Sequence, residues 1–281
     1  MSASLARTPR PRMLRHPTGV VAIVILVVLA LIAALAPVLA PHDPLSQSVM
    51  QANLAPSGEH WFGTDQFGRD VFSRVLYGTR SSLVLGTISP VLAALVGCAL
   101  GVIAGYFGGR PDRLISRLID LLMCFPELLL GIMVAAALGP GFWELVAALA
   151  LAFVPRFARI ARASTLQVRR EPFIEASIAV GCSHSLIIFR HVLPNIAGPI
   201  VVVLTLWVAT AIRLEATLSF LGLGTQPPQP SWGNIIHDGL NNLFGSPWPI
   251  IAAGAAITLT VLTFNLLGDA VRDLLDVERE E

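Results

Sequence analysis

The chain of 281 residues is 54% hydrophobic and only 13% charged, with a mean hydropathy of +0.72. A soluble domain carries roughly 25% charged residues, so this composition excludes an ordinary soluble protein and predicts an all-α, multi-pass membrane protein. The net charge of +1 argues against a nucleic-acid partner. All 19 basic residues are arginines, so the chain has no P-loop or Schiff-base lysine, and any nucleotide that drives it must bind another subunit.

Six apolar stretches are long enough to cross a membrane, since a spanning helix needs about 20 mostly apolar residues. They cover residues 20–40, 83–106, 115–138, 142–157 with an extension towards 168, 196–218 and 249–267. The first run is too long for the apolar part of a signal peptide, so we expect an uncleaved anchor. With the N-terminus in the cytoplasm, every arginine is cytoplasmic except Arg69, Arg74, Arg80 and Arg213. This asymmetry predicts that both termini lie in the cytoplasm.

Two segments lie outside the membrane in this topology, at about residues 42–81 and 225–248. The first contains a glycine-rich turn, followed by an amphipathic helix that we expect over residues 66–76. The second contains an interfacial helix that we expect over residues 231–242, with Trp232 and Trp248 suited to the membrane interface. Neither segment is long enough to form an independent domain of ordinary size.

The second span contains three glycines spaced four residues apart, Gly97, Gly101 and Gly105. This spacing places them on one helix face, where they let another backbone approach closely. The pattern is typical of generic tight helix packing, and a second interpretation is packing against a helix that moves.

The charged candidates within predicted spans are Asp120, Glu127, Glu144, Arg213 and Glu215. Asp120 and Glu144 are expected near span ends. The candidates that remain are Glu127, Arg213 and Glu215. Such charges usually face a bundle interior or a water-filled path, because their exposure to lipid is costly. Arg213 and Glu215 are two residues apart and point to different helix faces, so each should have a partner elsewhere. Both structural pairing between helices and lining of a translocation path remain open for these residues.

A basic stripe is formed by Arg156, Arg159 and Arg162, which recur every three residues at the end of the fourth predicted span. Such a stripe is typical of contact with lipid head groups. The alternative is contact with an acidic surface of a partner protein.

Residues 172–194 form a polar interruption between two strongly apolar segments. Pro172 suits a first helical turn, because its missing N–H has no partner there. Glu175 lies early in that helix, where a negative charge is favourable. Gly181 can take the left-handed conformation that ends a helix.

A second short helix is expected after this glycine, capped by Ser183 or Ser185 and ended by Pro194. Two helices hinged at a glycine in a cytoplasmic loop are well shaped to dock on a soluble partner. A connector that only lies on the membrane surface is the alternative.

No group of residues in the sequence predicts an enzyme or metal site. The six histidines are scattered, and no Ser/His/Asp set or pair of catalytic carboxylates is present. Cys98, Cys124 and Cys182 are not spaced to bind a metal with a histidine, so we expect ordinary buried thiols.

Residues 172–194 resemble the EAA loop of ABC importer permeases, in which Glu-Ala-Ala precedes a glycine and a distant Leu-Pro. The matching residues are Glu175, Ala176, Gly181, Leu193 and Pro194. Ser177 replaces the second alanine, and His191 stands at an isoleucine position. The resemblance implies that Glu175, Ala176, Ser177, Gly181, Leu193 and Pro194 form a loop that docks on an ATPase subunit.

Further motifs resemble one branch of that family, the C-type permease of dipeptide and oligopeptide importers. They lie at residues 61–65, 68–74, 214–224, 227–228, 231–233 and 265–273, so the resemblance extends from about residue 40 to the end. It implies the fold of type I ABC importer permeases, with six transmembrane helices. It also implies a tail at 1–19, an anchor at 20–40, an extracytoplasmic segment at 41–81, a permease domain at 82–270 and a cytoplasmic tail at 271–281.

The same resemblance implies the partners of the chain. They are a sister permease of the B type, two ABC ATPase subunits that carry ATP and Mg²⁺, and an extracytoplasmic solute-binding protein. This chain itself would bind no cofactor and would lie in the bacterial inner membrane. The substrate stays open among dipeptides, oligopeptides, nickel, glutathione and oligosaccharides, and the two ATPases can be identical or different.

Two other classes of protein fit the sequence less well. A secondary transporter often has paired broken helices and a polar site at the membrane midplane, but its inverted repeat is not visible here. A stand-alone intramembrane enzyme is disfavoured by the missing catalytic set. Copurification of ATPase subunits separates the importer from the secondary transporter.

Overall fold

The computed structural model describes residues 17–277 of the chain, and its regular elements there are helical. They are α1 (Pro17–Leu39), η2 (Val49–Gln51), α2 (Val71–Phe107), α3 (Gly109–Met123), α4 (Glu127–Leu138), α5 (Phe142–Val168), α6 (Pro172–Ala179), α7 (His184–Ile187), η3 (Ile188–Val192), α8 (Leu193–Phe220), α9 (Trp232–Leu240) and α10 (Trp248–Val277). Within the described range, extended pairing is limited to an isolated bridge between Thr64 and Asp70. The predicted all-α class is confirmed.

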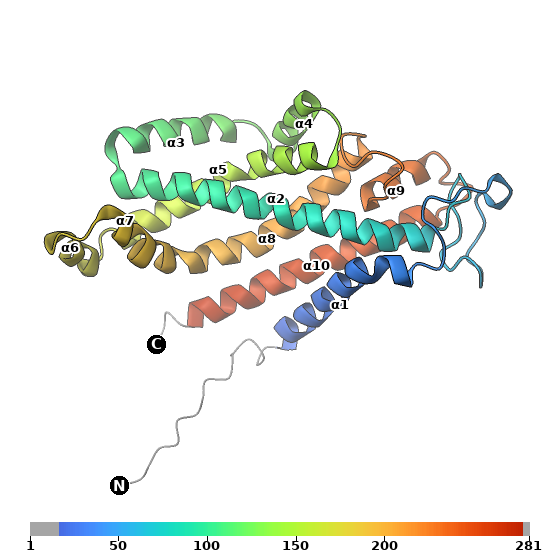
Figure 1. Cartoon of the computed structure of the whole chain (residues 1–281), viewed down its shortest axis with the longest axis horizontal. Coiled ribbons are helices and arrows are strands. Elements are labelled where there is room, and N and C mark those ends of the chain that lie inside the picture. The colour runs from blue at the N-terminus through green and yellow to red at the C-terminus, as the bar shows by residue number, and fades with distance from the viewer. Residues whose placement is uncertain (1–16, 278–281) are drawn as a thin grey trace, which may run out of the picture.

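The long helices α2, α5, α8 and α10 run lengthwise through the molecule (Figure 1). At one extremity lie α6, α7 and the connection between α2 and α3; we call this the α6 end. The segment at residues 40–70 lies at the opposite extremity, with α9 towards the same side, and we call this the α9 end. The two polar segments singled out in the sequence therefore lie at opposite ends of the helical bundle.

Four helical runs within residues 17–277 are long and apolar enough to cross a membrane. They are Thr18–Leu39, Val71–Phe107, His184–Phe220 and Trp248–Leu274, and a bent pair of helices can provide a fifth. Helix α5 has 27 residues, but Glu144 and three arginines interrupt its apolar run. The expected count of six spans is therefore approximate.

The third predicted span is a broken helix and not a continuous one. Helices α3 and α4 meet at an angle of 93°. The break falls at Pro126, which has φ of −56° and ψ of +138° and directly precedes α4. A proline disfavours the helical conformation of the residue before it, so α3 ends and a new helix starts in another direction.

The segment before α2 departs from the expected amphipathic helix over residues 66–76. These residues first form turns, and α2 starts at Val71 and continues without a break to Phe107. Asp70 starts the helix, since its Oδ2 accepts a hydrogen bond of 2.7 Å from the backbone N–H of Ser73. The amphipathic pattern belongs to the first turns of a long helix that packs against its neighbours.

The glycine stripe of α2 lies directly against α5. A Cβ atom built on Gly97 would stand 2.7 Å from Phe157 Cβ, and one built on Gly101 would stand 2.7 Å from Ala161 Cβ. One built on Gly105 would stand 2.9 Å from the Cβ of Thr165 on the same helix. Real Cβ atoms are essentially never found at such distances, so α2 and α5 pack backbone to backbone along this seam.

The helix expected over residues 231–242 is α9. The expectation that Trp232 lies at a membrane interface is wrong. Trp232 is completely buried, and its Nε1 donates to the carbonyl of Val75 at 3.3 Å. Ser231 caps the helix through a hydrogen bond from the N–H of Asn234. Trp232 thus attaches α9 to the first turns of α2.

Candidate functional site

The segment at residues 172–194 begins as a short helix closed by a left-handed glycine. Pro172 lies in the first turn of α6. Gly181 has φ of +84°. Its N–H donates to the carbonyl of Ile178, and the N–H of Cys182 donates to that of Ser177, both at 3.0 Å. These two bonds form a Schellman motif, which ends α6 and reverses the chain.

The second helix of this segment continues into α8 and does not end at Pro194. Ser183 caps α7 by accepting a hydrogen bond of 3.4 Å from Leu186 N–H. A π-helical turn, η3, follows, and α8 starts at Leu193 with Pro194 in its first turn. The prediction that Pro194 ends the helix is wrong, because the wide turn before it accommodates a residue that cannot donate a backbone hydrogen bond.

One side of α6 is anchored to the bundle. Ile174 is completely buried and packs in a cluster with Val102 and Tyr106 of α2 and with Ile187 of α7. Tyr106 Oη and His184 Nδ1 lie at hydrogen-bonding distance, 2.9 Å apart. Movement of α6 and α7 is therefore linked by contact to the end of α2.

Apart from Ile174, α6 and its C-cap residue Val180 are largely exposed, and this exposed surface is partly apolar. Phe173 is 41% exposed, Ile178 48% and Val180 85%. Glu175 and Ala176 are exposed beside them, whereas Ser177 is half-buried and donates its hydroxyl to the carbonyl of Phe173 at 2.7 Å. Several apolar side chains and a carboxylate thus lie together on a short helix at the α6 end.

The basic stripe of α5 faces acidic residues of α3 and α4. The pairs are Arg156 with Glu127 at 3.0 Å, Arg159 with Asp120 at 2.6 Å and Arg162 with Asp112 at 2.5 Å. The later an arginine lies in α5, the earlier its acidic partner lies in the chain, because α5 runs back along α4 and α3. Within residues 17–277 the stripe therefore pairs with acidic residues of the same chain, a contact that neither interpretation of the sequence included.

The strength of these pairs differs with their exposure. The side chains of Arg159 and Asp120 are 55% and 61% exposed, so water and salt screen this pair. Arg162 and Asp112 are 35% and 20% exposed, and two guanidinium nitrogens donate to the two carboxylate oxygens, at 2.5 and 2.8 Å. The Arg162–Asp112 pair is thus the best-formed link between α3 and α5.

Arg213 and Glu215 do not pair with each other, which agrees with their spacing of two residues. They lie in different surroundings. Arg213 is exposed and donates to Thr210 Oγ1 on its own helix at 3.2 Å. Glu215 is completely buried, and its Oε1 accepts a hydrogen bond of 2.8 Å from Ser219. The side chains of Ser82 and Ser231 lie beside the same carboxylate. Among the described residues, Glu215 Oε2 has no hydrogen-bond partner.

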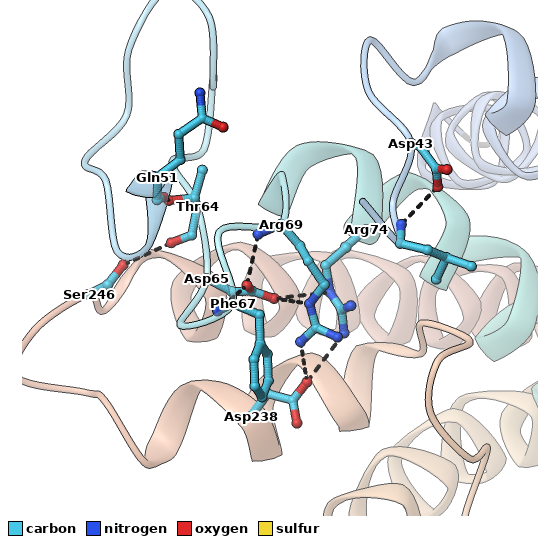
Figure 2. Close-up of polar contacts among 10 residues, drawn as sticks. Asp43, Gln51, Thr64, Asp65, Phe67, Arg69, Arg74, Asp238 and Ser246 are labelled. Atoms are coloured by element: carbon cyan, nitrogen blue, oxygen red, sulfur yellow. Dashed lines mark hydrogen bonds and ion pairs between the residues drawn. The ribbon is translucent and has the colours of Figure 1, made fainter. Parts of the chain in front are cut away.

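A buried group of charges at the α9 end was not predicted from the sequence. Arg69 donates to Asp65 at 2.6 Å and to Asp238 at 2.8 Å, and Arg74 donates to the same oxygen of Asp238 at 3.3 Å. Figure 2 shows the two guanidinium groups between the two carboxylates. The group fixes the turns before α2 against α9, which lies far away in the sequence. These charged residues are visible in the sequence, but no local pattern indicated that Asp238 would pair with Arg69 and Arg74.

Two cavities of comparable size are open at the surface. The first, of about 550 Å³, lies at the α9 end and is lined by Asp43, Tyr77 and Arg80 among others. The second, of about 560 Å³, is an apolar groove between α2 and α8, with Val102 and Leu193 in its lining. The lining of the first includes side chains of both charges, whereas the lining of the second is almost entirely apolar.

The fold is that of the permease subunits of ABC importers. A chain from the inward-facing methionine ABC transporter MetNI superposes with a TM-score of 0.60 over 72% of this chain and 97% of that chain. The two sequences are 18% identical, so the likeness concerns the fold.

The sequence also matches two family models. The model described as "Binding-protein-dependent transport system inner membrane component" matches residues 97–279. The model described as "N-terminal TM domain of oligopeptide transport permease C" matches residues 5–56. The chain therefore belongs to the family of binding-protein-dependent transport permeases, whose ATP hydrolysis is carried by separate subunits.

Two relatives show how closely the chain follows this family. The dipeptide transport permease DppC of Alkalihalophilus pseudofirmus is 42% identical over 94% of this chain and 87% of its own length. The glutathione transport permease GsiD of Pectobacterium atrosepticum is 41% identical over 94% of this chain and 88% of its own length. This chain thus corresponds to nearly the whole of both relatives.

Proposed function

We propose that this chain is one of two pore-forming permeases of an ATP-driven importer of short peptides, and that α6 docks on an ATPase subunit. The observation that carries the proposal is the exposed apolar surface of α6, made by Phe173, Ile178 and Val180. An anchored helix with apolar side chains exposed is typical of a surface that another protein covers. Glu175 and Ala176 lie on the same helix and take part in this docking.

The remaining site residues have supporting roles in this proposal. Gly181 sets the angle between α6 and α7. Leu193 and Pro194 form the first turn of α8 and so connect α7 and η3 directly to that helix. Gly97, Gly101 and Gly105 hold α2 against α5. Glu127 and Glu215 make contacts within the chain. Arg213 is exposed, so of these three charges it is the one available to a translocation path or to a sister permease.

The topology follows from the distribution of the arginines. In our proposal the α6 end is cytoplasmic, as are both termini, and the α9 end faces a solute-binding protein outside the cell. The pore forms with a sister permease, and ATP and Mg²⁺ bind the ATPase subunits. The division into a tail, an anchor at 20–40, an outer segment at 41–81, a permease domain at 82–270 and a second tail belongs to the same proposal.

The substrate class is inferred from the names of the relatives. One is a dipeptide permease and another a glutathione permease, and glutathione is itself a short peptide. We therefore propose peptides of two or three residues as substrates. Uptake of defined dipeptides, tripeptides and glutathione by vesicles that contain the whole importer tests this choice.

The docking role is tested with a Val180→Asp variant, coexpressed with the sister permease and the ATPase subunits. Val180 is 85% exposed, so the change should not disturb folding. A charge in an apolar contact is costly to bury, so we expect the ATPase to be lost during purification at moderate salt while the two permeases stay together. The control is Met50→Asp, which changes a 96% exposed side chain at the α9 end.

Unchanged copurification of ATPase with the Val180→Asp variant would contradict docking through α6. The absence of any copurifying ATPase from the wild-type chain would contradict the importer itself and favour a secondary transporter.

A further inference from the structure

Three residues of metal-binding types meet at the α9 end, where the segment after α1 reaches the start of α2. They are His42, His60 and Asp70, and one ligand atom from each lies within 4.8 Å of the other two. His60 Nδ1 stands 2.9 Å from Asp70 Oδ1, and His42 Nδ1 stands 3.9 Å from the same oxygen. The histidines appeared scattered in the sequence, and only the fold brings these two together with a carboxylate.

Two imidazole nitrogens in this cluster have no hydrogen-bond partner in the described chain, although both are shielded from solvent. They are His42 Nδ1 and His60 Nε2, and the His60 residue is only 4% exposed. A buried polar atom without a partner is destabilising, and a cation bound by His42 Nδ1 would satisfy that nitrogen; His60 Nε2 is not the ligand atom of its ring and does not support the site. His42 Nδ1 faces the Asp70 carboxylate from a distance that is too long for a hydrogen bond and short enough for both to contact one cation.

The three side chains are held in place by contacts around them. Asp70 Oδ2 accepts from the N–H of Ser73, while the backbone N–H of His42 donates to Ser73 Oγ at 3.2 Å. The N–H of His60 donates to Ser57 Oγ at 3.1 Å. Metal ligands are typically oriented by such surrounding hydrogen bonds, which reduce the cost of assembling the site.

We propose that His42, His60 and Asp70 bind a divalent transition-metal ion of the zinc type. Two imidazole nitrogens and one carboxylate oxygen form a ligand set that zinc uses with a water molecule in the fourth position. Zinc bonds of about 2.0–2.1 Å in tetrahedral geometry place ligand atoms about 3.3 Å apart, a separation that lies between 2.9 and 3.9 Å. On binding, the proton between His60 Nδ1 and Asp70 Oδ1 moves to Nε2, so His60 binds as a neutral ring.

The ion in this site has a structural role and is not the transported solute. His42 comes three residues after the end of α1, His60 lies in the turns before α2, and Asp70 caps α2. A bound ion would join these three segments at one point. The proposal therefore holds whether or not the importer carries peptides.

The test uses the full chain in its purified complex, with an affinity tag that contains no histidine. The complex is stripped with a chelator, desalted and titrated with zinc chloride alone, while bound zinc per chain and thermal stability are measured. We expect one zinc per chain and a rise in the melting temperature. X-ray absorption should show nitrogen and oxygen ligands at about 2.0–2.1 Å.

The decisive variant is His42→Ala, because His42 Nδ1 has no hydrogen-bond partner within the described chain, and loss of this ring, which contacts the ring of His60, should leave the metal-free protein folded. We expect zinc affinity to fall at least tenfold and the zinc-dependent rise in melting temperature to disappear. Asp70→Asn is a second variant, since asparagine still caps a helix but lacks the charged ligand. His237→Ala, which removes a histidine outside the cluster, should bind zinc like the wild type.

Failure of the wild-type complex to retain zinc would overturn the proposal. It would be overturned equally by zinc binding that stays the same in both His42→Ala and Asp70→Asn, because the ion would then lie elsewhere on the protein.

Discussion

Gly181 shows how a single residue can be required for its backbone alone. No atom lies within 4 Å of the position that a Cβ atom would occupy, so the space around it is open. Its φ of +84° is nevertheless a conformation that other residues rarely adopt. The sequence therefore predicted this turn well, because the requirement is local.

Gly181→Val should leave the chain in the membrane but uncouple transport from ATP hydrolysis. A β-branched residue costs roughly 1–2 kcal/mol or more in the left-handed region, which favours another angle between α6 and α7. We expect the number of peptides transported per ATP hydrolysed in vesicles to fall severalfold, whereas Gly181→Asn should retain most of it. Gly254→Val is the control, because Gly254 also has open space but lies within α10. Normal coupling in Gly181→Val would show that the turn can be made without glycine.

The sequence left two roles open for Glu215, structural pairing between helices and lining of a translocation path. The packing around Glu215 favours the first. Its partner on the same helix is Ser219, and Ser82 of α2 and Ser231 before α9 lie beside it. These hydroxyls suit a structural contact among α2, α8 and α9 more than a path for solutes. The partners expected for Glu215 elsewhere in the chain are thus hydroxyl groups.

Glu215→Gln should therefore be tolerated. Glutamine keeps the shape and can both donate to and accept from the three hydroxyls, while the cost of burying a charge is removed. We expect a change in unfolding free energy of less than about 1 kcal/mol and normal transport per folded complex. Reduced transport at unchanged thermal stability would instead support a role in gating.

At the scale of elements, the seam between α2 and α5 is a close contact that the glycine spacing indicated directly. The spacing of Gly97, Gly101 and Gly105 indicated close packing but could not identify the helix that fills the seam. That helix is α5, whose backbone lies against all three glycines. A pattern within one helix indicates a face, and only the arrangement of the whole chain decides what covers it.

Gly101→Leu should separate α2 from α5 and destabilise the bundle. Its Cβ alone would meet Ala158 and Ala161, and backbone atoms there cannot move aside. Overpacking of this kind costs typically 1–3 kcal/mol, so we expect a lower melting temperature and poor yield in detergent. Gly131→Ala serves as the control, because a Cβ atom there would stand an ordinary 3.5 Å from Leu218. A Gly101→Leu protein as stable as the wild type would show that the two helices do not pack so closely.

Other elements were predicted less well, each for an identifiable reason. The break between α3 and α4 falls at Pro126, whereas residues 115–138 were expected to form one span. The arginine stripe looked suited to lipids because its acidic partners lie 29 to 50 residues earlier in the chain. Trp232 suited a membrane interface by residue type, yet it fills the space between α9 and α2. Long-range partners decided all three outcomes.

For the whole molecule, the distribution of arginines predicts how the chain is oriented in the membrane, and chemical labelling can test this orientation. In a cysteine-free background, Glu59→Cys and Ser185→Cys place single thiols at exposed positions near the α9 end and the α6 end. We expect an impermeant maleimide to label the first in intact cells and the second only after lysis. Labelling in the opposite order would place the α9 end in the cytoplasm and remove α6 from the ATPase side.

Helix α2 is one continuous element that connects the two ends of the molecule. With 37 residues it is about 55 Å long, and it begins at Asp70 beside two histidines and ends after Tyr106, which contacts His184. The helix can therefore act as a lever, in which a tilt imposed at the α9 end arrives at α7 without any relay of side-chain changes. Pro90 lies near its middle, where a helix bends most easily. The stiffness of the helix at that one residue would set how much of a displacement at the α9 end reaches the α6 end.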